Sequence, residues 1–325
     1  MIVDRRQILS FAAASAIAPL VAEPACAETY PARPVRLVVG FPAGGATDVA
    51  ARLIGEWLQA RLGQPFIVEN RPGAGTNLAT EAVVRAPADG YTLLLTSTSN
   101  LLNGALYDNL KYDFIRDIAP VASLMATPLV LEVTPEIPAK SLNEFIAYAR
   151  AMPGKINMAH FGTGTVSHLA GEAFKMATGI DFVSVPYRGS APMLTDLLGG
   201  RVHAAFDTIP ASIEHIRAGS LRALAVTSAT RLEVLPNVPA IGEFVAGYEV
   251  IPIAGIGAPK GTPASIVEVL NREINAGLAD SKLRTWLNEV GAIPLQGSPA
   301  DFGRLISRET EKWASVIRLG GVKAN

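Results

Sequence analysis

Two spacings of apolar residues alternate along this 325-residue chain. Short apolar runs predict strands, and the run at 91–97 predicts a buried one, because Leu93, Leu94 and Leu95 leave no polar side. Between these runs, apolar residues recur every three or four positions, as in the helix expected over 47–62. We expect strands at 34–41, 66–69, 91–97, 156–158, 181–185, 201–206 and 221–228, and helices at 47–62, 77–85, 141–151, from about 167, 263–278, 282–290 and 299–319.

This alternation predicts an α/β fold with parallel sheets covered by helices. A chain of roughly 300 residues can bury a large core and usually divides into two domains. Ligands of parallel sheets bind at the carboxyl ends of the strands, so the segments that follow strands are candidate binding sites.

A glycine-rich loop at 41–45 follows the first expected strand and leads into the helix at 47–62. Ala43, Gly44 and Gly45 let the backbone approach a bound group closely, and the first N–H groups of the helix have no partner inside it. A carboxylate there would gain directed hydrogen bonds and the attraction of the helix dipole, each about 0.3–2 kcal/mol. Taken alone, the same sequence is also typical of a plain turn.

A second glycine-rich loop, at 159–165, repeats the arrangement. It follows the strand expected at 156–158 and precedes helical residues that begin near Ser167. Two such loops facing each other would hold a small molecule with two carboxylates.

The N-terminus predicts export. Arg5 and Arg6 precede an uncharged run at 7–22, and 25–27 has the small-x-small spacing of a cleavage site. The arginine pair resembles a twin-arginine signal, with general secretion as the alternative. The run is too short for a comfortable membrane span, and no later run reaches about 18 apolar residues. We therefore expect a periplasmic protein, released by cleavage and not embedded in the membrane.

Composition argues against several other classes. The formal net charge is −1, whereas nucleic-acid binding requires an excess of Lys and Arg on one face, so we expect no nucleic-acid partner. The single cysteine, Cys26, lies in the expected signal, which predicts no disulfide and no cysteine nucleophile. The four histidines lack zinc-site spacing, and we expect no metal and no cofactor.

Enzymes and dinucleotide-binding proteins are the competing interpretations. The chain has no G-x-S-x-G nucleophile elbow and no evident acid–base pair, so we expect no catalytic residue. A dinucleotide fold also begins with a strand, glycines and a helix, and Glu69 resembles its ribose-binding acid. However, Gly40, Gly44 and Gly45 do not give G-x-G-x-x-G, and Pro42 interrupts the pattern.

Several motifs together carry a family resemblance. They lie at 30–31, 41–45 with 48 and 51–52, 69–75, 89–92, 162–165 with 168–172, 185–189, 196–200 and 206–207. Each alone is weak, but the set is similar to the substrate-binding receptors of tripartite tricarboxylate transporters, the Bug receptors. The resemblance covers essentially the whole chain after the expected signal.

The resemblance implies a two-lobed periplasmic binding protein of type II, with two α/β domains that close on a small carboxylate. The chain would cross between the lobes near 126–128 and 248–252. The implied boundaries are 1–27 for the signal peptide, 28–127 with 251–325 for lobe one, and 128–250 for lobe two.

The implied function is delivery of a dicarboxylate, tricarboxylate or aromatic acid to the membrane permease subunits of a tripartite transporter, and we expect a monomer. The alternatives are a receptor that serves a sensor kinase and an exported enzyme that acts on carboxylic acids.

Position by position, the resemblance also implies ligand contacts in both lobes. They are Phe41, Ala43, Gly44, Gly45, Thr47, Asp48, Ser97, Thr98 and Asn100 in the first lobe, and Phe161, Thr163, Gly164, Thr165, His168 and Asp207 in the second. Asp207 would repel a ligand carboxylate, so it fits better as an acceptor for a hydroxyl, amine or water, or as a hinge or cap residue. Asp48 could instead cap its helix or pair with a neighbouring side chain. His168 could instead be a helix-start residue that packs at the surface of its lobe.

Three positions depart from the family pattern. Phe161 stands where serine is common, Thr76 where glycine is common and His203 where aspartate is common. The ring of Phe161 makes an aromatic or longer, more apolar acid a candidate ligand. Arg71 and Arg188 are either bidentate carboxylate clamps or ties between loops.

Overall fold

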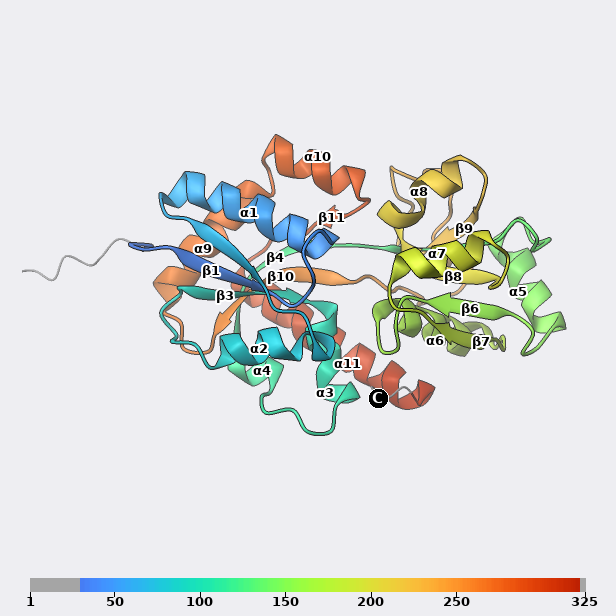
Figure 1. Ribbon diagram of the computed structural model, residues 1–325, viewed down its shortest axis with the longest axis horizontal. Coiled ribbons are helices and arrows are strands. Elements are labelled where there is room, and N and C mark those ends of the chain that lie inside the picture. Colours follow the sequence, from blue (N-terminus) through green and yellow to red (C-terminus); the bar gives the residue numbers. More distant parts are fainter. Residues whose placement is uncertain (1–29, 322–325) are drawn as a thin grey trace, which may run out of the picture.

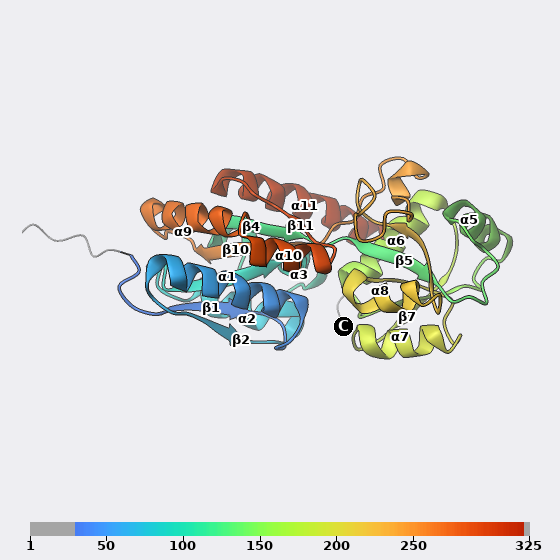
Figure 2. The same cartoon turned by 90° about the horizontal axis from the view of Figure 1, so that it is seen from above.

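The computed structural model describes residues 30–321 and shows two lobes side by side, each built around one β-sheet (Figure 1). Helices pack on the sheet of each lobe (Figure 2). The predicted export signal lies within residues 1–29, outside the described residues. Among residues 30–321, no helix combines the length and apolar character that a membrane span requires.

The first lobe contains a six-stranded sheet in the order β11-β4-β10-β3-β1-β2. Its strands are β1 (Val35–Val39), β2 (Phe66–Asn70), β3 (Thr92–Ser97), β4 (Ile118–Ala126), β10 (Ile253–Pro259) and β11 (Ile293–Pro294). Its helices are α1 (Ala46–Leu62), the 3₁₀ turn η1 (Ala74–Thr76), α2 (Asn77–Val84), α3 (Thr98–Leu106), α4 (Phe114–Asp117), α9 (Ala264–Gly277), α10 (Ser281–Glu289) and α11 (Pro299–Gly320).

Both faces of this sheet are covered. Leu93 and Leu95 of β3 belong to the core shared with α1, α9 and α10, whereas Leu94 belongs to the core shared with α2 and α11. The strand therefore has no polar side, as its sequence predicts.

The second lobe contains a five-stranded sheet in the order β7-β6-β8-β5-β9. Its strands are β5 (Leu129–Val133), β6 (Asn157–His160), β7 (Val183–Pro186), β8 (Ala204–Thr208) and β9 (Arg222–Val226). Its helices are α5 (Leu142–Ala151), α6 (Val166–Thr178), α7 (Ser190–Leu198), α8 (Ile209–Arg217) and the 3₁₀ turn η2 (Ile241–Glu243). The helix predicted from Ser141 is confirmed, with the Ser141 side chain accepting the Glu144 N–H.

The expectation of purely parallel sheets is wrong, because both sheets are mixed. β1, β2 and β3 are parallel, but β10 is antiparallel to β3 and to β4. In the second lobe, β5 is antiparallel to β8 and to β9. The cause is the path of the chain: β5 and β10 each enter a sheet from the other lobe, so they run against strands whose carboxyl ends face that lobe.

Two adjacent chain segments and one helix join the lobes. The short link between β4 and β5 lies beside the segment that leads into β10, because the Thr127 N–H donates to the Pro252 carbonyl at 2.8 Å. α11 contacts α3 and β4 in the first lobe and α6 in the second. Trp313 of α11 lies in the core cluster of the second lobe.

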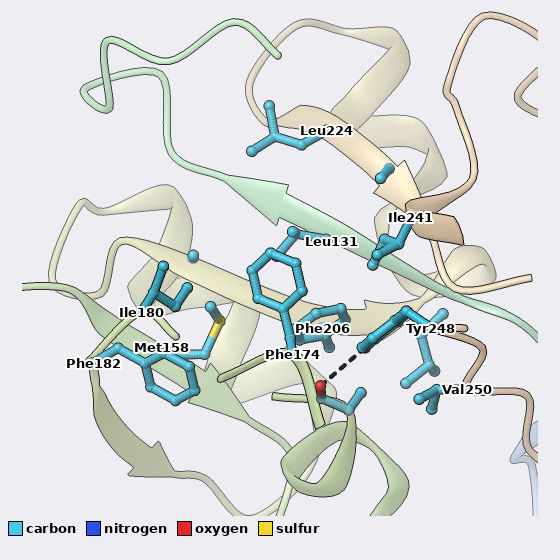
Figure 3. Close-up of a cluster of buried hydrophobic side chains, with 14 of the residues drawn as sticks. Leu131, Met158, Phe174, Ile180, Phe182, Phe206, Leu224, Ile241, Tyr248 and Val250 are labelled. Carbon is cyan, nitrogen blue, oxygen red and sulfur yellow. Dashed lines mark hydrogen bonds between the residues drawn. The ribbon is translucent and has the colours of Figure 1, made fainter. Parts of the chain in front are cut away.

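The same core holds the second crossing segment in place. Phe174 meets Phe206 and Tyr248 edge to face, with ring centroids 5.8 and 5.9 Å apart (Figure 3). The Tyr248 hydroxyl donates to the Ala170 carbonyl at 2.9 Å, the dashed bond in Figure 3. Tyr248 precedes β10, so the chain leaves this lobe from a packed, hydrogen-bonded position.

Candidate functional site

The first glycine-rich loop ends in a helix start that no side chain caps. Gly44 has a φ of 89°, and Gly45, the N-cap of α1, makes no side-chain cap bond. The first backbone bond of the helix is Val49 N–H to Gly45 carbonyl, at 3.0 Å. Among the described residues, the N–H groups of Ala46, Thr47 and Asp48 therefore have no partner. These groups, at the positive end of a 17-residue helix, suit an anion.

The Asp48 side chain ties this loop to its surroundings. It accepts the Gly44 N–H at 2.9 Å, two bonds from Arg52 at 2.9 and 3.0 Å, and one from Asn70 at 2.9 Å. Asn70 also donates to the Phe41 carbonyl at 3.0 Å. Arg52 is the main cause that lowers the pKa of Asp48 to about 2, so the carboxylate stays ionised and paired. The structure thus shows the local pairing that was one of the two interpretations of Asp48.

The second glycine-rich loop has the same architecture. Gly164 has a φ of 74°, and Thr165, the N-cap of α6, makes no side-chain cap bond. The first backbone bond of this helix is Leu169 N–H to Thr165 carbonyl, at 3.0 Å. Within residues 30–321, the N–H groups of Val166, Ser167 and His168 are likewise without a partner.

Two stacked imidazoles support this loop. The rings of His160 and His168 lie 4.2 Å apart, centroid to centroid, at an interplanar angle of 16°. His160 Nδ1 accepts the Gly162 N–H at 3.3 Å, and His168 Nδ1 accepts the Gly164 N–H at 3.2 Å. Burial lowers the pKa of His160 to about 4 and also lowers that of His168. Both rings are neutral at pH 7, which leaves Nδ1 free to accept.

The two loops correspond position by position but differ in charge. In each loop, a glycine with positive φ donates its N–H to the side chain four residues later: Gly44 to Asp48, and Gly164 to His168. That side chain in turn lies near an ionisable side chain another four residues along the helix. The first pair is Asp48 with Arg52. The second is His168 with Glu172, in which His168 Nε2 and Glu172 Oε1 lie 3.7 Å apart.

Strand direction shows that both loops face the boundary between the lobes. β4 runs to the link between the lobes, and β1 is parallel to β4 through the intervening β3 and β10. β5 starts from that link, and β6 and β8 run against it. The carboxyl ends of β1 and β6, from which the loops leave, are thus the ends nearest the other lobe (Figure 1). A Cβ on Gly164 would lie 3.1 Å from Leu106 of α3, across the boundary.

Three predicted contacts after β3 serve the packing of the first lobe. The Asn100 side chain accepts from the Ser97 N–H and hydroxyl and donates to Thr76 and Thr80. Thr98 accepts the Ile253 N–H at 2.7 Å. Thr98 and Asn100 are buried, so the structure places them beneath the surface and not among the exposed loop residues.

The remaining loop residues differ in exposure. Ala43, Gly44, Gly45 and Thr163 are exposed, while Phe41, Thr47, Phe161 and Thr165 are half-buried. The Phe161 ring packs against the core cluster that includes Ala159, Met193 and Leu197, so this ring is partly committed to packing.

Thr76 and His203, the other two positions that depart from the family pattern, have local partners, and so does Arg71. Arg188 has none among the described residues. Thr76 packs over the start of the first loop, where a Cβ on Gly40 would lie 2.7 Å from its own Cβ. His203 Nδ1 accepts the Asn157 N–H at 2.8 Å. Arg71 pairs with Glu69, two residues earlier in the same segment, at 2.5 Å. Arg188 is exposed and makes no hydrogen bond or ion pair with any described residue.

Asp207 lies at the end of β8, fully buried, together with a carboxyl group that the sequence analysis missed. Ser190, Ser212 and the Thr208 N–H all donate to Asp207. Desolvation raises the pKa of Asp207 to about 6. The missed residue is Glu132 of β5, whose one sequence signal is a lone charge inside the apolar run 129–133.

No group of three or more His, Cys, Asp and Glu side chains in residues 30–321 has an arrangement that could hold a metal ion. The two loops themselves offer backbone N–H groups and helix dipoles, which suit an anion.

The chain is similar to known proteins over most of its length. Residues 50–322 match the family model described as the tripartite tricarboxylate transporter family receptor. The chain is 41% identical over 310 residues to Protein BugT of Bordetella pertussis, covering 93% of this chain and 94% of the relative.

Solved structures are similar over most of their length. The R. palustris protein Rpa4515 with adipate is 40% identical, with a TM-score of 0.80 and coverage of 90% of this chain and 99% of that one. MatC from Rhodopseudomonas palustris, with bound malate, is 34% identical, with a TM-score of 0.76 and coverage of 89% and 100%.

Proposed function

This chain belongs to the tripartite tricarboxylate transporter receptor family, and from that premise we propose that it binds a small carboxylate between its lobes and delivers it to a membrane permease. The family consists of solute receptors and not enzymes, and the two-lobed α/β fold matches its solved members. The ligand, the permease and the site residues are the parts that we propose.

One observation carries the proposal: two uncapped helix starts face the boundary between the lobes. Each offers three N–H groups with no partner among the described residues. A helix start with free N–H groups and an aligned dipole favours negative charge. Two of them on opposite lobes suit a molecule that carries a carboxylate at one end or at both.

The similar proteins support a carboxylate as the ligand. The structure of Rpa4515 contains adipate, and that of MatC contains malate. In our proposal Phe41, Ala43, Gly44, Gly45 and Thr47 line one side of the ligand, and Thr163, Gly164, Thr165 and His168 line the other. Phe161 adds an apolar wall that suits a longer or aromatic acid.

Export to the periplasm, a cleaved signal at 1–27 and action as a monomer complete the proposal. The hydrophobic N-terminal run with its paired arginines supports export. Lobe boundaries at 28–127 with 251–325 and at 128–250 place the rotation at the crossing segments.

Binding is tested by thermal shift and calorimetry with adipate, malate, citrate and phenylacetate. At about 100 times its dissociation constant, a true ligand adds about 2.7 kcal/mol to the free energy of unfolding. We expect at least one acid to bind without being converted. Turnover of the bound acid, or no binding by any of them, would contradict the proposal.

Glycine variants test the location of the site. Gly44→Ala adds a methyl group on the exposed surface of the first loop, where the ligand would sit, and should weaken binding by about tenfold or more. Gly63→Ala is the matched control, because it lies at the other end of α1 with φ 76° and equally open surroundings. Equal losses of affinity in the two variants would show that backbone strain, and not the site, is responsible.

A further inference from the structure

Four side chains at the carboxyl edge of the second sheet form one hydrogen-bonded array. The Ser212 hydroxyl lies 2.9 Å from Glu132 Oε1 and 3.3 Å from Asp207 Oδ2. Ser190 donates to the same Asp207 oxygen at 2.5 Å, and the Thr208 N–H donates to Asp207 Oδ1 at 2.7 Å. Glu132, Asp207 and Ser212 are fully buried, whereas Ser190 is half-buried.

The number of donors and acceptors in this array decides which carboxyl group carries a hydrogen. The Ser212 hydroxyl has one hydrogen for two carboxyl contacts, so one carboxyl group must be an acid that donates to Ser212. Asp207 accepts from Ser190 and Thr208, as a carboxylate does, while Glu132 Oε2 has no partner. A buried unpaired oxygen costs less on a neutral acid than on a carboxylate. Glu132 therefore holds the proton, and hydrogen bonds run from Glu132 through Ser212 to Asp207.

The electrostatics of the array agree with this count. Desolvation and the charge of Asp207 raise the pKa of Glu132 well above its usual value, while that of Asp207 rises to about 6. No Lys, Arg or His of residues 30–321 forms a hydrogen bond or ion pair with either group, and the imidazoles of the neighbouring loop, His160 and His168, are neutral. A bound proton on Glu132, and not a positively charged side chain, therefore prevents a second buried negative charge beside Asp207.

Ser190 connects the array to the proposed ligand site. It is the first residue of α7, which starts at the same sheet edge as the second glycine-rich loop, because β6 and β7 are parallel neighbours. Ser167 of α6 donates to the Phe206 carbonyl at 2.5 Å, one residue from Asp207. Since the Ser190 hydroxyl donates its hydrogen to Asp207, and the residue is half-buried, its oxygen keeps lone pairs that can accept a further hydrogen bond. A hydrogen-bond acceptor thus lies at the same sheet edge as the N–H groups that would hold a carboxylate.

We infer that this array selects carboxylates that carry a hydrogen-bond donor, a hydroxyl or ammonium group, next to the carboxylate, and that Ser190 accepts that hydrogen bond. This inference rests on the proposed function. An acid without the donor leaves the Ser190 oxygen and its hydrogen-bonded Asp207 unmatched, and unmatched polar groups at a binding site discriminate strongly between analogues.

Matched pairs of acids test the inference by calorimetry on the purified protein at pH 7.5. The pairs are malate with succinate, 2-hydroxyadipate with adipate, and mandelate with phenylacetate. We expect the hydroxy acid of any pair that binds to do so about tenfold more tightly or better. Ser190→Ala should remove most of this preference. Asp207→Asn should also reduce it, because the Asn side-chain N–H can donate to Ser190 and release its hydrogen outward.

Ser184→Ala on β7 is the matched control, since Ser184 lies outside the array, and it should keep the preference. Equal affinities within the pairs, or a preference unchanged by Ser190→Ala, would overturn the inference while the proposed function stands, because the acids still bind. If none of the acids binds, the proposed function fails and the inference fails with it.

A measurement without ligand tests the shared proton separately. At pH 7.5 the infrared spectrum should contain the carbonyl band of a protonated carboxylic acid, and Glu132→Gln should lack it. The glutamine N–H can replace the acid as donor to Ser212, so this variant should fold. Absence of the band from the unchanged protein would overturn the placement of the proton on Glu132.

Discussion

Asp48 and His168 hold equivalent positions in the two glycine-rich loops, and each accepts the N–H of a glycine four residues earlier. Asp48 does so as a carboxylate balanced by Arg52, and His168 does so as a neutral ring. The first loop therefore depends on an ion pair, and the second depends on the protonation state of histidine.

Arg52→Met should weaken carboxylate binding by about tenfold. Without its guanidinium partner, the Asp48 charge is no longer balanced and repels a ligand carboxylate at the helix start. Arg61→Met, on the same helix, removes a comparable bond to buried Glu273 far from the loop and is the control. Calorimetry measures both dissociation constants, and an unchanged value for Arg52→Met would rule out this balancing role.

Acid should destabilise the protein through His160. Its pKa is about 4 in the folded state against about 6.5 when unfolded, so the unfolded state binds more protons between these values. This contribution is complete above pH 6.5 and is lost as the pH falls toward 4. Asp207, with a pKa raised to about 6, acts in the opposite direction, so variants must be compared.

The measurement is the thermal midpoint at pH 7.5 and at pH 5. His160→Gln should lose less on acidification than the unchanged protein, by about 2–4 °C, the shift that about 2 kcal/mol produces in a chain of roughly 300 residues. His215→Gln, on α8, is the control because His215 lies outside the stacked pair of imidazoles. Identical acid sensitivity in all three proteins would contradict a role for His160.

Among the elements, α3 connects the first lobe to the crossing strand. Its first residue, Thr98, accepts the Ile253 N–H at the point where β10 enters the sheet, and its last, Leu106, lies against Gly164 of the other lobe. The helix therefore links the start of β10 to the second glycine-rich loop.

Thr98→Val keeps the shape of this side chain and leaves the buried Ile253 N–H without its acceptor. The expected loss is about 1–3 kcal/mol in the free energy of unfolding, measured by urea titration. Thr195→Val, an exposed position on α7, should change it by no more than about 0.5 kcal/mol. If both variants unfold alike, the Thr98 bond does not stabilise the protein.

For the whole molecule, we expect from the proposed function that the lobes rotate about the two crossing segments when a ligand binds. A ligand that binds both loops gains contacts in the closed form that the open form lacks, and this difference shifts the population. Small-angle scattering should show a smaller radius of gyration with saturating ligand than without it. Gly44→Ala, measured at the same ligand concentration, should show less of this change, and an unchanged radius for the unmodified protein would contradict closure.

The sequence by itself determined the local features. Apolar spacing gave α1 and β3 to within one residue of their observed bounds, because the contacts that decide them repeat within the element. The uncapped helix starts were also predictable, since free N–H groups follow from a strand, a glycine-rich turn and a helix in succession. The family resemblance rests on the same local motifs.

Tertiary structure alone decided which distant residues meet. The antiparallel entry of β5 and β10 depends on the path of the chain between lobes, and the burial of Thr98 depends on Ile253, which lies 155 positions away. Glu132 and Ser212 are 80 positions apart, so no local pattern links them. The helix starts that can hold an anion follow from sequence neighbours, whereas the proton held beside them follows from the packing of strands and helices that the chain brings together only on folding.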